Sequence, residues 1–206
     1  FGINKNTSYL INTDKISLAN DMHWTEVFPS GIVDLTLRHR EVASEEEKYQ
    51  QESLYLVDQW CNQYEKNIRE LGGIGFFLGG IGPDGHIAFN VRGSDHNSTT
   101  RLTQTNFETQ ATAAVDLGGI EISRNRLVIT IGLGTIAYNK EATAIIIAAG
   151  EAKAPIIQTS LESDQSIMYP ASSLQKLNNS RFYITEGASK KLKDTENRYW
   201  KESTWD

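Results

Sequence analysis

Cysteine is almost absent from this chain, whose 206 residues include a single one, Cys61. One thiol cannot form an internal disulfide or a cysteine-cluster metal site, so we expect no such metal site and a reducing, cytoplasmic location. Long apolar runs are missing too. No stretch approaches the roughly 18 apolar residues of a membrane-spanning helix, and no basic segment followed by an apolar one opens the sequence. We therefore expect no membrane partner.

Positive charge is in the minority, with 20 Lys and Arg against 26 Asp and Glu and a net charge of −6. A general nucleic-acid-binding protein needs a basic patch to neutralise phosphates, so we expect no nucleic-acid partner. The remaining composition is ordinary for a globular protein, 39% hydrophobic and 22% charged. The length suits one sizeable α/β domain with its own core, and we take residues 1–206 as that single domain.

The first clear element is a long helix after Ser44. Ser44 suits the N-cap position, Glu47 suits the matching position of a capping box, and the first turn is acidic. Gly72 and Gly73 predict the end of the helix. Apolar side chains recur at helical spacing on one predicted face: Val57, Trp60, Cys61, Tyr64, Ile68 and Leu71. The first forty residues show no clean periodicity.

Strands and helices alternate after this helix. Strands are predicted at residues 74–78, 126–131, 143–149 and 181–185. Helices are predicted from the GLGT turn through Glu141, and at 150–161, 172–177 and 186–192. Three consecutive isoleucines in the third strand require cover on both faces, which favours the centre of a parallel sheet. The alternation predicts a layered α/β domain with a mostly parallel sheet.

The stretch FFLGGIGPDGHIAFN, residues 76–90, ends a predicted strand in a cluster of glycines. Ligands of an open parallel sheet bind at the carboxyl ends of its strands, where this loop is expected. Glycines let a ligand approach the backbone, and their N–H groups can face an anion or a hydroxyl. Asp84 and His86 follow, and a neighbouring carboxylate orients an imidazole and raises its basicity. The alternative is a plain turn with a structural histidine, which the complete string makes the poorer interpretation.

GGIGPDGHIAFN closely resembles the signature of the glucosamine-6-phosphate deaminase/isomerase family, which belongs to a superfamily shared with 6-phosphogluconolactonases. The stretches CNQYEKNIRELGGIGFFLGGIGPDG, LVITIGLGTI and KEATAIIIAAGEAKA resemble further family blocks in the same order. The resemblance covers roughly residues 60–190. It implies a Rossmann-like three-layer α/β domain with a mostly parallel sheet.

The resemblance also implies roles for individual residues. His86 would open the sugar ring by moving a proton at the ring oxygen, and Asp84 would work beside it as the second catalytic residue. Lys153 would bind the sugar phosphate at the start of a helix, where free N–H groups and the helix dipole already favour an anion. Three residues would line the substrate: Gly80, Gly82 and Asn90.

The chemistry that the resemblance implies is an aldose–ketose isomerisation through an enediol, coupled in deaminases to loss of ammonia. It requires a ring-opening acid/base, a carboxylate that carries a proton between two carbons, and a phosphate anchor. No metal or organic cofactor is required. The expected partner is a small phosphosugar such as glucosamine-6-phosphate, and a homo-oligomer is expected by analogy with other members.

The sequence departs from the family pattern in three places. The family usually has a glutamate directly after AFN that helps to orient the histidine, whereas this chain has Val91. A phosphate-binding arginine is expected near residues 111–115, which hold no basic residue. The family's TGxT/S turn and acidic DE motif, which holds the enediol base, have no clear match in residues 1–75. Asp21 or Glu26 would be guesswork for that base.

Two interpretations of these departures stay open. The N-terminal part of the family domain is either missing from this chain, which would then be a fragment, or diverged. In the second case the site is eroded, and the chain is a sugar-phosphate-binding protein with impaired catalysis or an isomerase with altered substrate preference.

Two rival enzyme classes also fit parts of the sequence. A 6-phosphogluconolactonase-like hydrolase is disfavoured because its signature typically continues toward TASLFPG, whereas IAFN follows the histidine here. A dinucleotide-binding oxidoreductase is suggested by GLGTIA at residues 132–137, with Glu151 near the distance of a ribose-binding acid. The same glycines also suit a tight strand-to-helix turn in the isomerase block.

Overall fold

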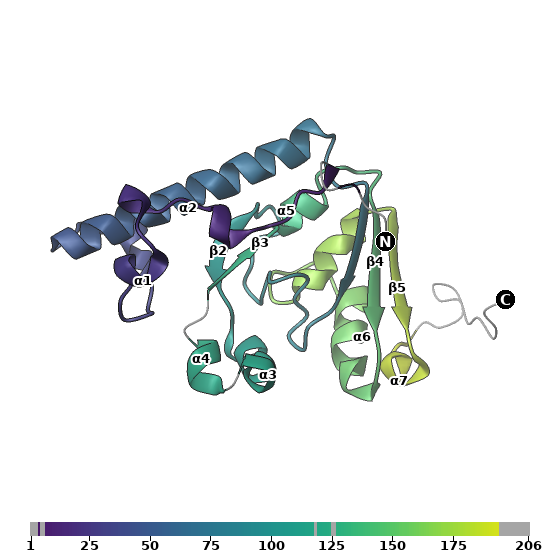
Figure 1. The fold of residues 1–206 in the computed structure, drawn as a ribbon. Helices are drawn as coiled ribbons and strands as arrows, with labels where there is room; N and C mark the ends of the chain where they lie inside the picture. Colours follow the sequence, from purple (N-terminus) through teal and green to yellow (C-terminus); the bar gives the residue numbers. More distant parts are fainter. Residues whose placement is uncertain (1–3, 5–6, 118, 125–126, 194–206) are drawn as a thin grey trace.

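The computed structural model describes residues 4, 7–117, 119–124 and 127–193 (Figure 1). Residue 126, predicted to begin a strand, and the polar tail from 194 to 206 lie outside the described residues. The strands are β1 (Phe76–Gly80), β2 (Arg101–Gln104), β3 (Leu127–Thr130), β4 (Thr143–Ala148) and β5 (Asn179–Ile184). The α-helices are α1 (Trp24–Val27), α2 (Glu45–Glu70), α3 (Phe107–Leu117), α4 (Ile120–Arg124), α5 (Leu133–Ile136), α6 (Ala154–Glu162) and α7 (Glu186–Ser189). Short 3-10 helices are η2 (Thr13–Lys15), η3 (Ala19–Asp21), η4 (Leu35–Arg38), η5 (Glu151–Lys153) and η6 (Pro170–Lys176).

Helix α2 confirms the predicted long helix. The Ser44 hydroxyl accepts the Glu47 N–H at 3.1 Å as its N-cap. Its buried positions are Ser53, Leu54, Val57, Cys61 and Glu65, so the inner face is rotated from the predicted one. Leu71 was predicted on that face, and this is wrong: the helix has ended before it and its side chain is 68% exposed.

The predicted parallel sheet is present, in the strand order β1-β4-β5. Both pairings are parallel, and β4, the strand with three isoleucines, lies in the centre as expected. Ala144 and Ile146 of β4 are fully buried, and they pack in one core with Leu133 of α5, Ile157 of α6 and Leu174 of η6. These helices therefore cover one face of the sheet, and the chain has the predicted α/β class.

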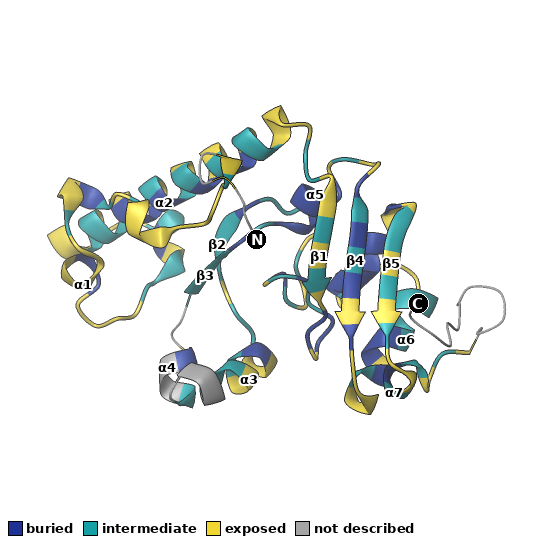
Figure 2. Cartoon of the chain, turned by 45° about the vertical axis from the view of Figure 1, so that its right-hand side comes forward, coloured by how far each residue is buried: buried dark blue, intermediate teal, exposed yellow. Residues whose placement is uncertain are grey.

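The opposite face of the sheet is open, and Figure 2 shows exposed positions along its strands. The strand register places four exposed apolar side chains on it: Phe76 at 59%, Leu78 at 58%, Ile147 at 55% and Tyr183 at 46% exposure. Within the described part of the chain, no helix crosses this face in Figure 2.

Strands β2 and β3 form a separate antiparallel ribbon. The sequence predicted the second of these strands as part of the alternating parallel pattern, and that assignment is wrong. Strand β2 was not predicted, because three of its four residues are half-buried, Gln104 is exposed, and its sequence has no apolar alternation. Helices α3 and α4 connect β2 to β3 and lie at the end of the ribbon (Figure 1).

The helix predicted through Glu141 is wrong in extent, because α5 ends at Ile136. Asn139 accounts for the early end. Its side-chain oxygen accepts the Glu141 N–H at 3.0 Å and its carbonyl accepts the Ala142 N–H at 3.1 Å, which forms a turn in place of another helical turn.

Among the described residues, no helix combines the length and the apolar character that a membrane-spanning helix requires.

Candidate functional site

The loop after β1 folds back on itself. The Gly82 N–H donates to the His86 carbonyl at 2.9 Å, and Gly85 turns the chain between them with a φ of +84°. Ala88 also lies in the left-handed region, with a φ of +51°, which is uncommon for a residue with a side chain. This backbone brings Asp84 and His86 to the same side of the loop.

Asp84 and His86 are directly hydrogen-bonded, with 2.5 Å between Asp84 Oδ1 and His86 Nδ1. Burial alone would raise the pKa of Asp84, but hydrogen bonds from His86, the Arg92 amide and Asn106 outweigh it and hold that pKa well below its ordinary value of 3.8. The carboxylate is therefore ionised, and His86 Nδ1 must carry the proton that it donates. Among the described residues, the His86 ring has hydrogen-bond partners only at Nδ1, where Thr109 Oγ1 also lies 3.3 Å away. In the neutral ring, Nε2 keeps its lone pair for a ligand.

The imidazole of His86 packs directly against the backbone of Gly82. A Cβ atom at this position would lie 2.0 Å from Cε1 and 2.1 Å from Nδ1 of His86. The sequence suggested that the missing side chain of Gly82 leaves space for a ligand. In the structure the His86 ring fills that space. The Phe89 ring lies nearly parallel to the imidazole, with 6.4 Å between the ring centroids.

Lys153 reaches the same loop from η5. Its ammonium donates to the Ile81 carbonyl at 2.7 Å. Ile81 directly precedes Gly82, against which the imidazole packs. Burial lowers the pKa of Lys153 from its ordinary value of 10.5, and the nearby Asp84 carboxylate acts in the opposite direction. The lysine also occupies the N-cap position of α6, but the expected free N–H groups are not found at the first two positions, because the Ala154 N–H donates to the Glu151 carbonyl and Pro155 has no N–H. The structure therefore gathers Asp84, His86 and Lys153 around one loop.

Asn90 lies beneath this loop and is fully buried. Its amide nitrogen donates to the Ile87 and Ile131 carbonyls at 3.0 and 2.8 Å. Its oxygen accepts from Arg101 Nη1 at 2.8 Å and from Ser98 Oγ at 3.4 Å. All four contacts are internal, so Asn90 fixes the end of the loop and offers no free amide to a ligand.

Gly80 ends β1 at the carboxyl edge of the sheet and is exposed. The nearest atom to a Cβ placed there is the Ile147 carbonyl oxygen, 3.8 Å away. Of the two predicted substrate-binding glycines, Gly80 is the one with open space beside it.

Known proteins resemble this chain along much of its length. No protein-family model matches it. It is 36% identical over 142 residues to the glucosamine-6-phosphate deaminase of Phocaeicola vulgatus, which covers 69% of this chain and 53% of the relative. It is also 36% identical over 141 residues to the glucosamine-6-phosphate deaminase of Caenorhabditis elegans, covering 68% of this chain and 52% of that protein. The chain belongs to the glucosamine-6-phosphate deaminase/isomerase family.

A solved member of the NagB superfamily agrees with this assignment. A monomeric glucosamine-6-phosphate deaminase superposes with a TM-score of 0.60 at 29% sequence identity, over 65% of this chain and 54% of that chain. The chain spans about half the length of the curated relatives that it matches.

Two residues at the start of α3 belong to the site of this family member and were not predicted. Asn106 donates its side-chain amide to Asp84 Oδ2 at 2.6 Å, and Thr109 lies beside His86 Nδ1. The sequence does carry one signal, because asparagine is a preferred residue at the N-cap of a helix. That signal predicts the helix start and not the contact with Asp84, which is 22 residues away in sequence.

The dinucleotide fingerprint at residues 132–137 is not a ligand site in this deaminase/isomerase family member. A Cβ at Gly132 would lie 1.9 Å from the Ser98 carbonyl oxygen, and the Gly134 N–H donates to the same oxygen at 2.8 Å. The turn is thus filled by the chain itself, where a pyrophosphate would have to lie. Glu151, the candidate ribose-binding acid, contacts the Lys190 ammonium at 2.5 Å.

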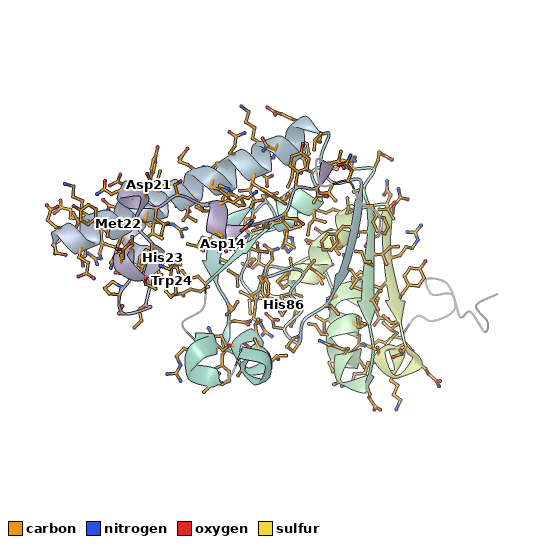
Figure 3. The ribbon with its side chains drawn as sticks, in the orientation of Figure 1. Asp14, Asp21, Met22, His23, Trp24 and His86 are labelled. Carbon is orange, nitrogen blue, oxygen red and sulfur yellow. The ribbon has the colours of Figure 1, made fainter. Side chains whose placement is uncertain are left out.

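The upstream candidates for the enediol base lie elsewhere. In Figure 3, Asp21 lies beside α2, well away from His86. Glu26 accepts the His23 N–H at 2.7 Å as part of a capping box at α1. Neither residue joins the Asp84–His86 pair.

The described residues contain no group of three or more His, Cys, Asp or Glu side chains that could hold a metal ion.

Proposed function

We propose that this chain acts on a phosphorylated amino sugar, glucosamine-6-phosphate or a close relative, as an isomerase/deaminase. The supporting observation is the Asp84–His86 pair, which has a 2.5 Å hydrogen bond and lies on the loop that also holds Lys153. The names of the relatives give the substrate class, since both are glucosamine-6-phosphate deaminases.

In the proposed reaction His86 moves a proton at the ring oxygen and opens the sugar. The Asp84 carboxylate keeps Nδ1 protonated and stabilises the imidazolium when Nε2 takes up a proton. The Lys153 ammonium leaves the Ile81 carbonyl and pairs with the sugar phosphate, which positions the ring next to the imidazole. Gly80 leaves space for the sugar at the edge of the sheet. The open chain then isomerises through an enediol-type intermediate to an imine at C2, and water adds to this imine, which gives the ketose and releases ammonia.

A second candidate function is phosphosugar binding without turnover. The observation that favours it is the position of Asp21 and Glu26, the two upstream candidates for the enediol base. Both lie away from the Asp84–His86 pair, so neither supplies a second carboxylate to the described site. Ring opening and binding need only Asp84, His86 and Lys153, whereas isomerisation also needs a base that carries a proton between two carbons.

The test is release of ammonium and formation of fructose-6-phosphate from glucosamine-6-phosphate, with 6-phosphogluconolactone as a parallel substrate. We expect turnover that His86→Gln abolishes and a KM that Lys153→Met raises at least 10-fold. Binding without ammonium release would select the second candidate. Absence of binding to any phosphosugar would refute both, and hydrolysis of the lactone would select the lactonase class instead.

We also propose that the protein works in the cytoplasm, with a small phosphosugar as its partner and with no nucleic acid or membrane. A homo-oligomer is proposed by analogy alone, and the solved relative is monomeric. Light scattering on the purified chain tests this point, and a single mass of one chain would refute the oligomer.

A further inference from the structure

The Asp84 side chain is enclosed by three hydrogen-bond donors and is 1% exposed. Oδ1 accepts from His86 Nδ1, and Oδ2 accepts from the Arg92 amide at 3.0 Å and from Asn106 Nδ2 at 2.6 Å. His86 and Arg92 belong to the same loop as Asp84. Asn106 is the one of these three donors that comes from another element, the start of α3, so it fixes the carboxylate relative to the rest of the site.

Asn106 has little freedom to turn away. Its side-chain oxygen accepts the Thr109 N–H at 3.0 Å, and its carbonyl accepts the Gln110 N–H at 2.9 Å, so it is the N-cap of α3. Because the oxygen is used by the cap, the amide nitrogen must face Asp84. A flipped amide would lose both side-chain bonds at once.

Thr109 extends this contact to the other member of the pair. It is 7% exposed, and its hydroxyl oxygen lies 3.3 Å from His86 Nδ1. The first turn of α3 therefore touches the carboxylate through Asn106 and the imidazole through Thr109. Val91 has no side-chain group that could do the same.

We propose that Asn106, supported by Thr109, is the positioning residue of the Asp84–His86 pair in this chain, in place of the glutamate that the family signature carries where this sequence has Val91. The inference rests on the proposed function. Asn106 contacts neither substrate nor reacting atoms in this arrangement. Its amide fixes the position of the Asp84 carboxylate, and the carboxylate fixes His86 Nδ1. The orientation of the ring, and with it the direction of the Nε2 lone pair, is set by these two contacts.

A purely structural role as helix cap makes different predictions. Aspartate and serine are both good N-cap residues, so Asn106→Asp and Asn106→Ser preserve the start of α3. Neither can donate an amide N–H to Asp84, and aspartate places a second carboxylate against the first. Gln110→Ala is the matched control, since its side chain donates to the Thr105 carbonyl at 2.7 Å from the same turn of α3 without contacting Asp84.

The experiment combines NMR of the whole chain with kinetics on glucosamine-6-phosphate. The NMR readout is the downfield proton of His86 Nδ1–H, which does not depend on turnover. We expect this signal to move upfield and to exchange faster with water in Asn106→Ser, more so in Asn106→Asp, and to be unchanged in Gln110→Ala. In the Asn106 variants we expect kcat to fall about 10-fold to 100-fold, with KM changed by no more than about 2-fold. This loss is smaller than the roughly 100-fold to 10,000-fold that a positioned proton-transfer group contributes to the rate, because His86 itself is still present.

The outcomes separate this inference from the proposed function. An unchanged Nδ1–H signal in both Asn106 variants would overturn the positioning role, whatever the activity. A wild-type chain without turnover, in which the signal still responds, would refute the enzyme and leave the positioning contact established. Thr109→Val, which removes the hydroxyl at similar volume, gives a second variant should the Asn106 proteins unfold, and we expect the same direction of change.

Discussion

At the scale of single residues, Gly82 is the position on which the imidazole depends most directly. A methyl group there would lie 2.0 Å from the His86 ring, so Gly82→Ala forces the ring off its place above the backbone. We expect loss of phosphosugar turnover and a destabilisation of about 1–3 kcal/mol from overpacking. Gly75→Ala is the control, because nothing lies within 4 Å of a Cβ at Gly75. Activity and thermal unfolding measure both effects, and an active Gly82→Ala protein would contradict the placement of the ring.

Glu65 is a second residue with more contacts than its sequence context suggests. This buried carboxylate of α2 accepts from the Thr135 hydroxyl at 2.6 Å, from the Thr100 hydroxyl and amide at 2.9 and 3.1 Å, and from Arg69 at 2.8 Å. Burial alone would raise the pKa of Glu65, but these hydrogen bonds outweigh it and lower that pKa below its ordinary value of 4.5. Glu65 thus ties α2 to the two segments that flank the site.

This lowered pKa predicts a pH dependence. Because the folded-state value is below the unfolded one, the stabilisation by Glu65 is fully present above about pH 4.5 and is lost as the pH falls through the folded value. We expect Glu65→Gln to cost about 1–3 kcal/mol at pH 7. The two proteins should converge in stability in acid, which urea unfolding between pH 7 and pH 3 measures. A constant difference across that range would contradict the prediction.

The sequence predicted part of the site for identifiable reasons. Asp84 and His86 are close in sequence, so their spacing indicated a pair, and Lys153 followed from the family resemblance. Asn106 and Glu65 could not be found, because their partners lie 22 and 35 residues away and depend on tertiary packing. Asn90 was given a ligand role that its internal hydrogen bonds leave no room for.

At the scale of elements, the turn before α5 depends on contact with the Ser98 segment. A Cβ at Gly132 would lie 1.9 Å from the Ser98 carbonyl oxygen, a backbone atom that cannot rotate away. We expect Gly132→Ala to destabilise the fold by about 3 kcal/mol. Gly80→Ala should leave stability unchanged, because its Cβ would meet only the Ile147 carbonyl oxygen at 3.8 Å. Chemical denaturation compares the two, and equal stabilities would refute the close approach.

Elements with strong local signals were predictable, and those defined by pairing were not. Helix α2 has a cap, an acidic first turn and two terminal glycines, and β4 is almost wholly apolar. In contrast, β2 and β3 have four residues each and owe their direction to each other. No local pattern distinguishes an antiparallel ribbon from a further strand of the parallel sheet.

At the scale of the whole molecule, the parallel sheet is asymmetric. One face is packed against helices, while the other exposes Phe76, Leu78, Ile147 and Tyr183. We expect this face to bind an apolar fluorescent dye. The double substitution Leu78→Ser and Ile147→Thr should reduce the dye binding at little cost in stability. Ile146→Thr, on the packed face, is the contrast and should destabilise by about 1–3 kcal/mol. Dye binding unaffected by the double substitution would place the apolar surface elsewhere.

The planar peptide unit between Ile81 and Gly82 contacts both Lys153 and His86. Its carbonyl holds the Lys153 ammonium at 2.7 Å, and the next α-carbon supports the imidazole. If phosphate binds Lys153 as we propose and draws the ammonium away from the Ile81 carbonyl, we expect the backbone against which the His86 ring packs to lose this restraint. Inorganic phosphate alone should shift the NMR signals of His86, and Lys153→Met should remove that response.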